Sequence, residues 1–346
     1  MVVERHFTVG RRMRFGALGS IVYAVTLATG AHNSPAQSTA GTAGIAAGSL
    51  PDRLPEVGNS PAPASQDIAI QAPSRGVPSA LDPIVIQARR DREIKKQITK
   101  FVSGSVVTYF DESLERWNQP ICPLVVGLPS KPAEFVRARV LQVARDSNAP
   151  AGSENCNPNL IVVVTNDPDL LLEKWYKGLR GVFNSCSGLG PVKKFLQSSQ
   201  PVRAFYNARF TSVGGRGVGA LELDGLNLPF PSECLSTGQL GTHLRRGSVQ
   251  AMTSVIIVVD GRQTTKINMG QLSDYIAMIG LAQIRIKADT SIAPSILRLF
   301  EGPDPQPEGL TPWDEALLHS LYTTDQSSVL EVPIIEDRMF KQLAGH

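Results

Sequence analysis

The segment that decides the fold runs from residue 254 to residue 283 and contains "SVIIVVDG" (254–261) and then "MGQLSDYIAMIGLAQ" (269–283). The first stretch is a short apolar run that stops at an aspartate and a glycine, which predicts a buried strand over residues 254–260. The second stretch is apolar almost all round, which is typical of a helix buried in the middle of a domain. The sequence therefore predicts a strand that leads into a buried helix, with Asp274 and Tyr275 inside that helix.

Upstream of this segment, strands and helices alternate. Residues 124–126 and 160–165 ("LIVVVT") are short apolar runs of strand length. Residues 132–146 carry an apolar stripe at helical spacing, and residues 166–179 begin with the cap and proline signals of a helix. This order predicts an α/β layer.

The other parts of the chain give weaker signals. Residues 84–88 ("IVIQA") predict a short strand, and the apolar spacing that follows predicts an amphipathic helix. Helices are expected over residues 292–300, 312–322 and 335–343. Residues 181–247 are rich in glycine and proline and predict an irregular insertion. Within it, "RAFYNARF" (203–210) alternates like a strand and "GGRGVG" (214–219) is expected to form a hairpin turn.

The N-terminal 82 residues are not expected to belong to the folded domain. Four arginines (Arg5, Arg11, Arg12 and Arg14) precede an uncharged apolar stretch over residues 15–31. This layout predicts a secretory signal peptide over residues 1–31, cut after Gly30 or Ala31, and the alternative is an uncleaved membrane anchor. Residues 32–82 lack Phe, Trp and Tyr and are predicted to be a disordered tether that spans on the order of 40 Å. A periplasmic or secreted location follows.

Charge argues against a nucleic-acid partner. The chain has 34 Lys and Arg and 31 Asp and Glu, for a net charge of +3. Removal of residues 1–31 takes away four Arg and one Glu, so these counts become 30 and 30. The mature chain is therefore nearly neutral, which excludes a broad electrostatic attraction to nucleic acid.

Four cysteines (Cys122, Cys156, Cys186 and Cys234) are expected to form two disulfides in an oxidising compartment. None of them stands at the close spacing of zinc ligand pairs. Cys122 and Cys156 each precede a strand of the predicted β-α-β unit. If those strands are parallel neighbours, their starts are close, so we predict the pairs Cys122–Cys156 and Cys186–Cys234.

Five stretches occur in an order that resembles an exported bacterial family of unknown function. They are "RWNQPICPLVVGLP", "NCNPNLIVVVT", "GQLSDYIAMIGLAQ", "ILRLFEG" and "GLTPWDEALLHSLY". The C-terminal part of that family is similar in layout to zincin-like domains, in which a strand leads into a helix with the sequence His-Glu-x-x-His. The resemblance covers roughly residues 116–343 and implies a zincin-like mixed sheet packed with helices. We expect a single α+β domain over residues 83–346.

The zinc motif itself is missing. When it is placed on the helix, its histidine positions hold Asp274 and Met278, and its glutamate position holds Tyr275. The folded region contains only three histidines: His243, His319 and His346. Because a zinc peptidase needs three protein ligands and a general base, the sequence predicts no metal site, and it indicates no cofactor.

Two functions remain open. The first is a non-catalytic binding or scaffold domain whose partner is an envelope protein or polymer, with membrane contact only through an uncleaved leader. In this interpretation Asp274 pairs with an arginine or a backbone group, because a buried carboxylate needs a partner. The second is a carboxylate-dependent envelope hydrolase in which Asp274 shares a cleft with Asp260 or Asp314 and Tyr275 donates a proton.

Overall fold

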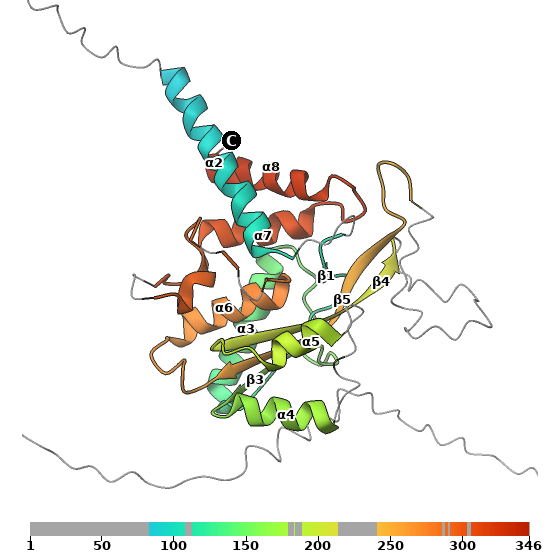
Figure 1. Cartoon of the computed structure of the whole chain (residues 1–346), viewed down its shortest axis with the longest axis vertical. Helices are drawn as coiled ribbons and strands as arrows, with labels where there is room; N and C mark the ends of the chain where they lie inside the picture. Colours follow the sequence, from blue (N-terminus) through green and yellow to red (C-terminus); the bar gives the residue numbers. More distant parts are fainter. Residues whose placement is uncertain are drawn as a thin grey trace, which may run out of the picture.

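The structure of the protein is a computed structural model, which describes residues 83–107, 113–178, 183, 189–213, 241–285, 288–289, 291–302 and 306–345. The predicted leader and tether lie outside the described residues, as does the turn expected at residues 214–219. Figure 1 shows a central sheet with helices on both sides and one long helix that extends away from it. No helix in the described ranges is long and apolar enough to cross a membrane.

The sheet is mainly parallel. Its strands are β1 (Arg116–Trp117), β2 (Pro123–Val126), β3 (Leu160–Thr165), β4 (Val202–Ser212) and β5 (Ser248–Asp260). β3 pairs in parallel with β2 on one edge and with β5 on the other. β4 pairs antiparallel with the far edge of β5, and β1 makes a short parallel pairing with β5. β4 is therefore an edge strand, and none of the described strands pairs with its outer side.

Helices cover both faces of this sheet, which explains why residues 160–164 of β3 and 255–259 of β5 are apolar without interruption. α3 (Ser130–Asp146) and α6 (Met269–Leu281) cover one face, and α4 (Pro168–Gly178) and α5 (Leu189–Leu196) cover the other. Alternate strand side chains enter the two cores: Leu160, Val162, Val255 and Ile257 on one side, and Ile161, Val163, Ile256 and Val258 on the other. The predicted mixed sheet packed with helices is confirmed, in a parallel-dominant α/β form.

Three helices form an outer group beside α6. They are α2 (Pro83–Ser105), α7 (Pro312–Thr323) and α8 (Glu331–Ala344), and a 3₁₀ turn, η4 (Ile296–Phe300), precedes α7. α7 begins with the expected capping box, in which Thr311 accepts from the backbone of Asp314 and the Asp314 carboxylate accepts from the backbone of Thr311.

The buried strand and helix of the deciding segment are confirmed. The strand begins earlier than expected, at Ser248, and α6 ends at Leu281. α6 lies very close to the sheet at Gly280, where an added Cβ would stand 2.8 Å from a methyl carbon of Leu160. A capping box between Asn268 and Gln271 fixes the start of the helix.

Three sequence predictions are corrected. Residues 84–88 are the start of α2 and form no strand, because Pro83 suits a first helical turn and the charged residues that follow favour helix. The helix expected over residues 292–300 is reduced to the short turn η4. The region 181–247 is less irregular than predicted, since it contributes α5 and the long strand β4.

Candidate functional site

Asp274, the first candidate catalytic residue, has both carboxylate oxygens engaged within the fold. It lies in α6 and is 5% exposed. Its Oδ1 accepts a hydrogen bond of 2.5 Å from Nε of Arg139 on α3, and its Oδ2 accepts one of 3.0 Å from the backbone N–H of Leu310. Asp274 therefore has both kinds of partner that were expected for a structural carboxylate. We call Asp274, Arg139 and Leu310 the Asp274 cluster.

Arg139 is a residue of this cluster that the sequence did not single out. The hydrogen bond to Asp274 is the main cause that raises the pKa of Arg139, burial opposes this, and the charges of Asp146 and Glu315 add to the rise. The Arg139 side chain is 30% exposed, so the pair is reached by water from one side. Helical periodicity predicts that Arg139 lies on the polar side of its helix, but it cannot say which tertiary partner it meets.

Residues 306–311 cover the polar side of α6. Two hydrogen bonds join this segment to α6. The Gln271 side chain donates to the carbonyl of Pro307 at 2.7 Å, and the backbone N–H of Leu310 donates to Asp274, which lies about one helical turn after Gln271. Gly309 lies between these contacts, and a Cβ added there would stand 2.7 Å from Oδ2 of Asp274. The chain can approach the carboxylate this closely only because residue 309 has no side chain.

Tyr275, the second candidate catalytic residue, lies against Phe300 and lines a hollow, away from the Asp274 cluster. Its ring packs edge-on against Phe300, with 4.9 Å between ring centroids. Burial raises the pKa of its hydroxyl to about 12. The hydroxyl makes no hydrogen bond within the described residues, and Tyr275 lines a hollow between α6 and β4. Tyr275 thus stays protonated at neutral pH and offers the hollow a hydrogen-bond donor.

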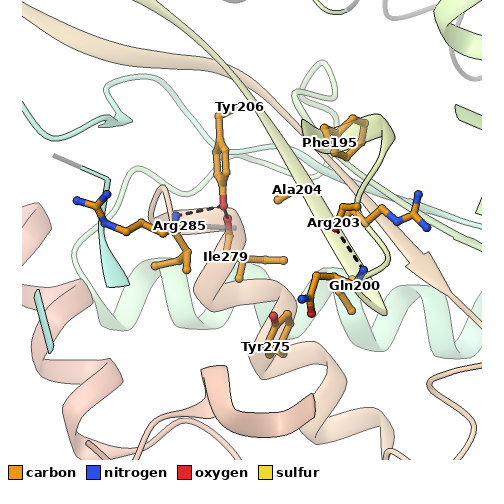
Figure 2. A pocket seen from close by; sticks show the side chains of 11 residues that line it. Phe195, Gln200, Arg203, Ala204, Tyr206, Tyr275, Ile279 and Arg285 are labelled. Carbon is orange, nitrogen blue, oxygen red and sulfur yellow. Dashed lines mark hydrogen bonds between the residues drawn. The ribbon is translucent and has the colours of Figure 1, made fainter. Parts of the chain in front are cut away.

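The hollow is small, with about 60 Å³ of space for water-sized molecules, and is partly open to solvent. Figure 2 shows Tyr275 beside Gln200, with Tyr206 of β4 at the other end. Tyr206 donates to the carbonyl of Ile279 at 2.8 Å and accepts from the backbone of Ile284 at 3.3 Å, so it ties β4 to α6. The remaining lining combines apolar and polar residues: Phe195, Ser198, Val202, Arg203, Ala204 and Arg285. Four of the lining residues, Val202, Arg203, Ala204 and Tyr206, belong to β4.

Asp260 and Asp314 each have local structural roles. Asp260 accepts from the backbone of Arg262 and from the Gln263 side chain, both at 2.9 Å. Burial alone would raise the pKa of Asp260, but these hydrogen bonds together lower it. Asp314 is fully buried and accepts from Ser295 Oγ at 2.5 Å and from the backbone of Ile296 at 2.8 Å. In the described residues, the hydrogen bonds of these two carboxylates and of Asp274 go to separate partners.

The first predicted disulfide is present. Cys122 and Cys156 are bonded, and their Cα atoms lie 5.8 Å apart. The geometric reason is the expected one, because β2 and β3 are parallel neighbours with Pro123 opposite Leu160. Cys186 and Cys234 lie outside the described residues.

The histidines do not approach α6 as a ligand set. His243 and His319 are both exposed, the first in a loop and the second on α7, and His346 lies outside the described residues. Across the described ranges, no group of three or more His, Cys, Asp or Glu residues is placed to hold a metal ion.

A second buried ion cluster was not foreseen. Glu331, at the start of α8, pairs with Arg116 of β1 and, at 3.3 Å, with Arg246. Its Oε2 also accepts from the backbone N–H of Leu114 at 3.1 Å. Burial lowers the pKa of Arg116 to about 10. We call Arg116, Arg246 and Glu331 the Glu331 cluster, and it joins the sheet to the connection between α7 and α8.

Comparison of the chain with known proteins finds no matching family model, no similar curated protein and no similar solved structure. The function is therefore argued from the site alone.

Proposed function

We propose that this protein is a non-catalytic binding or scaffold domain that works outside the cytoplasm, on a zincin-like core without the zinc motif. The observation that carries the proposal is the complete use of the Asp274 carboxylate by Arg139 and Leu310. The strand-to-helix step from β5 into α6 is in keeping with a zincin-like core. The disulfide between Cys122 and Cys156 suits an oxidising compartment.

A carboxylate hydrolase fits the site less well. A general acid or base has to reach a proton of its substrate within hydrogen-bond distance. Asp274, Asp260 and Asp314 are at most 5% exposed, and each accepts hydrogen bonds from the protein itself. To act on a substrate, Asp274 would have to give up Arg139 and the segment that lies over it.

The hollow beside Tyr275 is the proposed place for a ligand, and an extended segment of an envelope protein is the ligand that suits it best. An extended peptide can add to an exposed sheet edge, with backbone hydrogen bonds for affinity and side pockets for specificity. Among the described strands β4 is an edge strand, and the hollow that Tyr275 lines lies beside it.

The test is selection of random linear peptides on the full chain, followed by measurement of their affinity for variants. Gln200→Trp should close the mouth of the hollow, and Tyr275→Phe should remove its donor, so both should weaken binding about tenfold, the size of one lost hydrogen bond. Gln197→Trp, an exposed position three residues away, is the matched control and should change nothing.

Two outcomes would contradict the proposal. One is selected peptides that bind all variants equally. The other is turnover of an envelope polymer by the purified chain that is lost in Asp274→Asn while the variant remains folded.

A further inference from the structure

The first turns of α2, over residues 85–90, are exposed, and the helix begins to pack against the core at Ile94. The helix spans Pro83–Ser105, but its first fully buried side chain is Ile98, and Phe101 and Val102 follow. The earlier turns extend beyond the body of the molecule, as Figure 1 shows. A helix that continues for several turns past its last buried contact presents a surface that the fold itself does not need.

Cations gather on one side of this projecting half. Arg89, Arg92 and Lys96 follow one another at intervals of three and four residues, which places them on one helical face. That face lies opposite the one that buries Ile98 and Phe101. All three side chains are exposed, and none of them makes an ion pair within the described residues. The stripe therefore presents three cations to the surroundings.

The nearby acidic residues do not neutralise the stripe through ion pairs. The Asp91 carboxylate accepts from the Gln87 side chain at 3.0 Å, and the Glu93 carboxylate accepts from the Gln97 side chain at 3.4 Å. Both bonds run along the helix, between residues four apart. Glu93 lies four residues after Arg89 and three before Lys96, on the same face, so the stripe carries three cations and one acid, a net charge of +2.

Exposed aliphatic side chains stand at the tip of the same helix. Val85 is 39% exposed and Ile86 is 53% exposed. Val85 lies one turn before Arg89, so it continues the cationic face. Apolar side chains beside a cationic band are typical of helices that lie in the interface of an anionic membrane.

We propose that the N-terminal half of α2 docks on the surface of an anionic phospholipid bilayer. Arg89, Arg92 and Lys96 contact lipid phosphates, and Val85 and Ile86 enter the boundary between head groups and acyl chains. A dissolved polyanion would satisfy the cations but would leave the two aliphatic side chains in water. The bilayer is therefore the partner that uses the whole surface, and it acts independently of the hollow beside Tyr275.

The proposal is tested by the binding of the full chain to vesicles of phosphatidylcholine, with and without one third phosphatidylglycerol. The four arginines of an uncleaved leader would themselves favour anionic vesicles, so the measured quantity is the change in the preference for anionic over neutral vesicles between the parent and a variant with the same leader. We expect a clear preference at 0.1 M salt, where screening extends over about 10 Å, and its loss at 1 M salt.

Substitution of the stripe gives the decisive comparison. The triple variant Arg89→Gln, Arg92→Gln and Lys96→Gln should lower the preference by on the order of 100-fold. Ile86→Asn should weaken binding to anionic vesicles about tenfold. The control replaces three exposed lysines on other helices, Lys131, Lys174 and Lys194, by Gln and should keep the preference within about threefold of the parent, because it removes the same charge elsewhere.

Three results would overturn the proposal. The first is an anionic preference that the triple variant retains. The second is an equal loss in the control, which would point to net charge alone. The third is binding to soluble polyglutamate that competes fully with vesicles and is unaffected by Ile86→Asn, which would assign the stripe to an acidic polymer.

Discussion

The Asp274 cluster and the Glu331 cluster are both buried ion pairs, yet they differ in charge balance and in contact with water. Asp274 meets one arginine, and the Arg139 side chain is 30% exposed. Glu331 meets two arginines, and the exposed fractions of its own side chain and of Arg116 are 0% and 5%. In the first cluster water reaches a single ion pair, whereas in the second a fully buried carboxylate is shared by two arginines.

This difference shows which buried charges a sequence reveals. Asp274 stands out because an acid interrupts an apolar helix. Glu331 stands at the start of an ordinary amphipathic helix, and its hydrogen bond to Arg246 joins residues 85 apart in the chain. Nothing local marks it. The more deeply buried cluster is the one that only the fold assembles.

The largest expected effect is the loss of Glu331. Glu331→Gln removes the buried negative charge with which Arg116 and Arg246 pair, and removal of one partner from a buried pair costs about 3–5 kcal/mol. Urea denaturation of parent and variant measures the loss in the free energy of unfolding. Glu154→Gln, at an exposed position, is the control and should lie within about 0.5 kcal/mol of the parent. An equal effect of both substitutions would remove the distinction between buried and exposed acids.

Asp274→Asn should have a smaller effect. It removes a charged hydrogen bond to Arg139 that is partly open to water, and we expect a loss of about 1.5–3 kcal/mol in the free energy of unfolding. Metal content, measured on the purified protein by mass spectrometry, should not change. One equivalent of zinc per chain that is lost in Asp274→Asn would restore the metallopeptidase interpretation.

Gly309→Ala probes the same cluster from the covering segment. The added methyl group would stand 2.7 Å from Oδ2 of Asp274, so the segment has to shift, at a cost of about 1–3 kcal/mol. Gly190→Ala is the matched control, because a Cβ at that helical position meets nothing within 4 Å and should be neutral or stabilising. If Gly309→Ala were as stable as the parent, residues 306–311 would not be held closely against Asp274.

Arg245→Gln should have the smallest effect. Arg245 neighbours Arg246 in the chain, but its ion pair with Asp325 is exposed on both sides, and such pairs contribute about 0.2–1 kcal/mol. Hydrogen bonds from Ser327 are the main cause that lowers the pKa of Asp325. The charge of Arg245 adds to this lowering, so the stabilisation by the ion pair is present above the ordinary aspartate pKa and is lost as pH falls through the lowered pKa of Asp325. Thermal melts at pH 7 should show a slight difference from the parent that fades in acid, whereas Arg246→Gln should remain strongly destabilised at pH 7.

Much of the fold could be predicted because its signals are local. The apolar runs that become β3 and β5 are continuous, since each strand is covered on both faces. The Thr311 cap depends on residues three apart. The pairing of Cys122 with Cys156 followed from one assumption about neighbouring parallel strands. The weaker predictions failed where local signals competed, as in residues 84–88, whose β-branched side chains favour strand although the segment continues a helix.

The sequence alone thus determined which residues form the central strands and helices, that Asp274 needs a partner, and that His-Glu-x-x-His is absent from α6. Only the tertiary structure decided that the partner is Arg139, that residues 306–311 lie over the carboxylate, and that Tyr275 faces a hollow at the edge of β4. The physical reason is range. Helix and strand propensity arise from neighbours a few residues apart, whereas a charge pair or a hollow depends on how separate elements pack against one another.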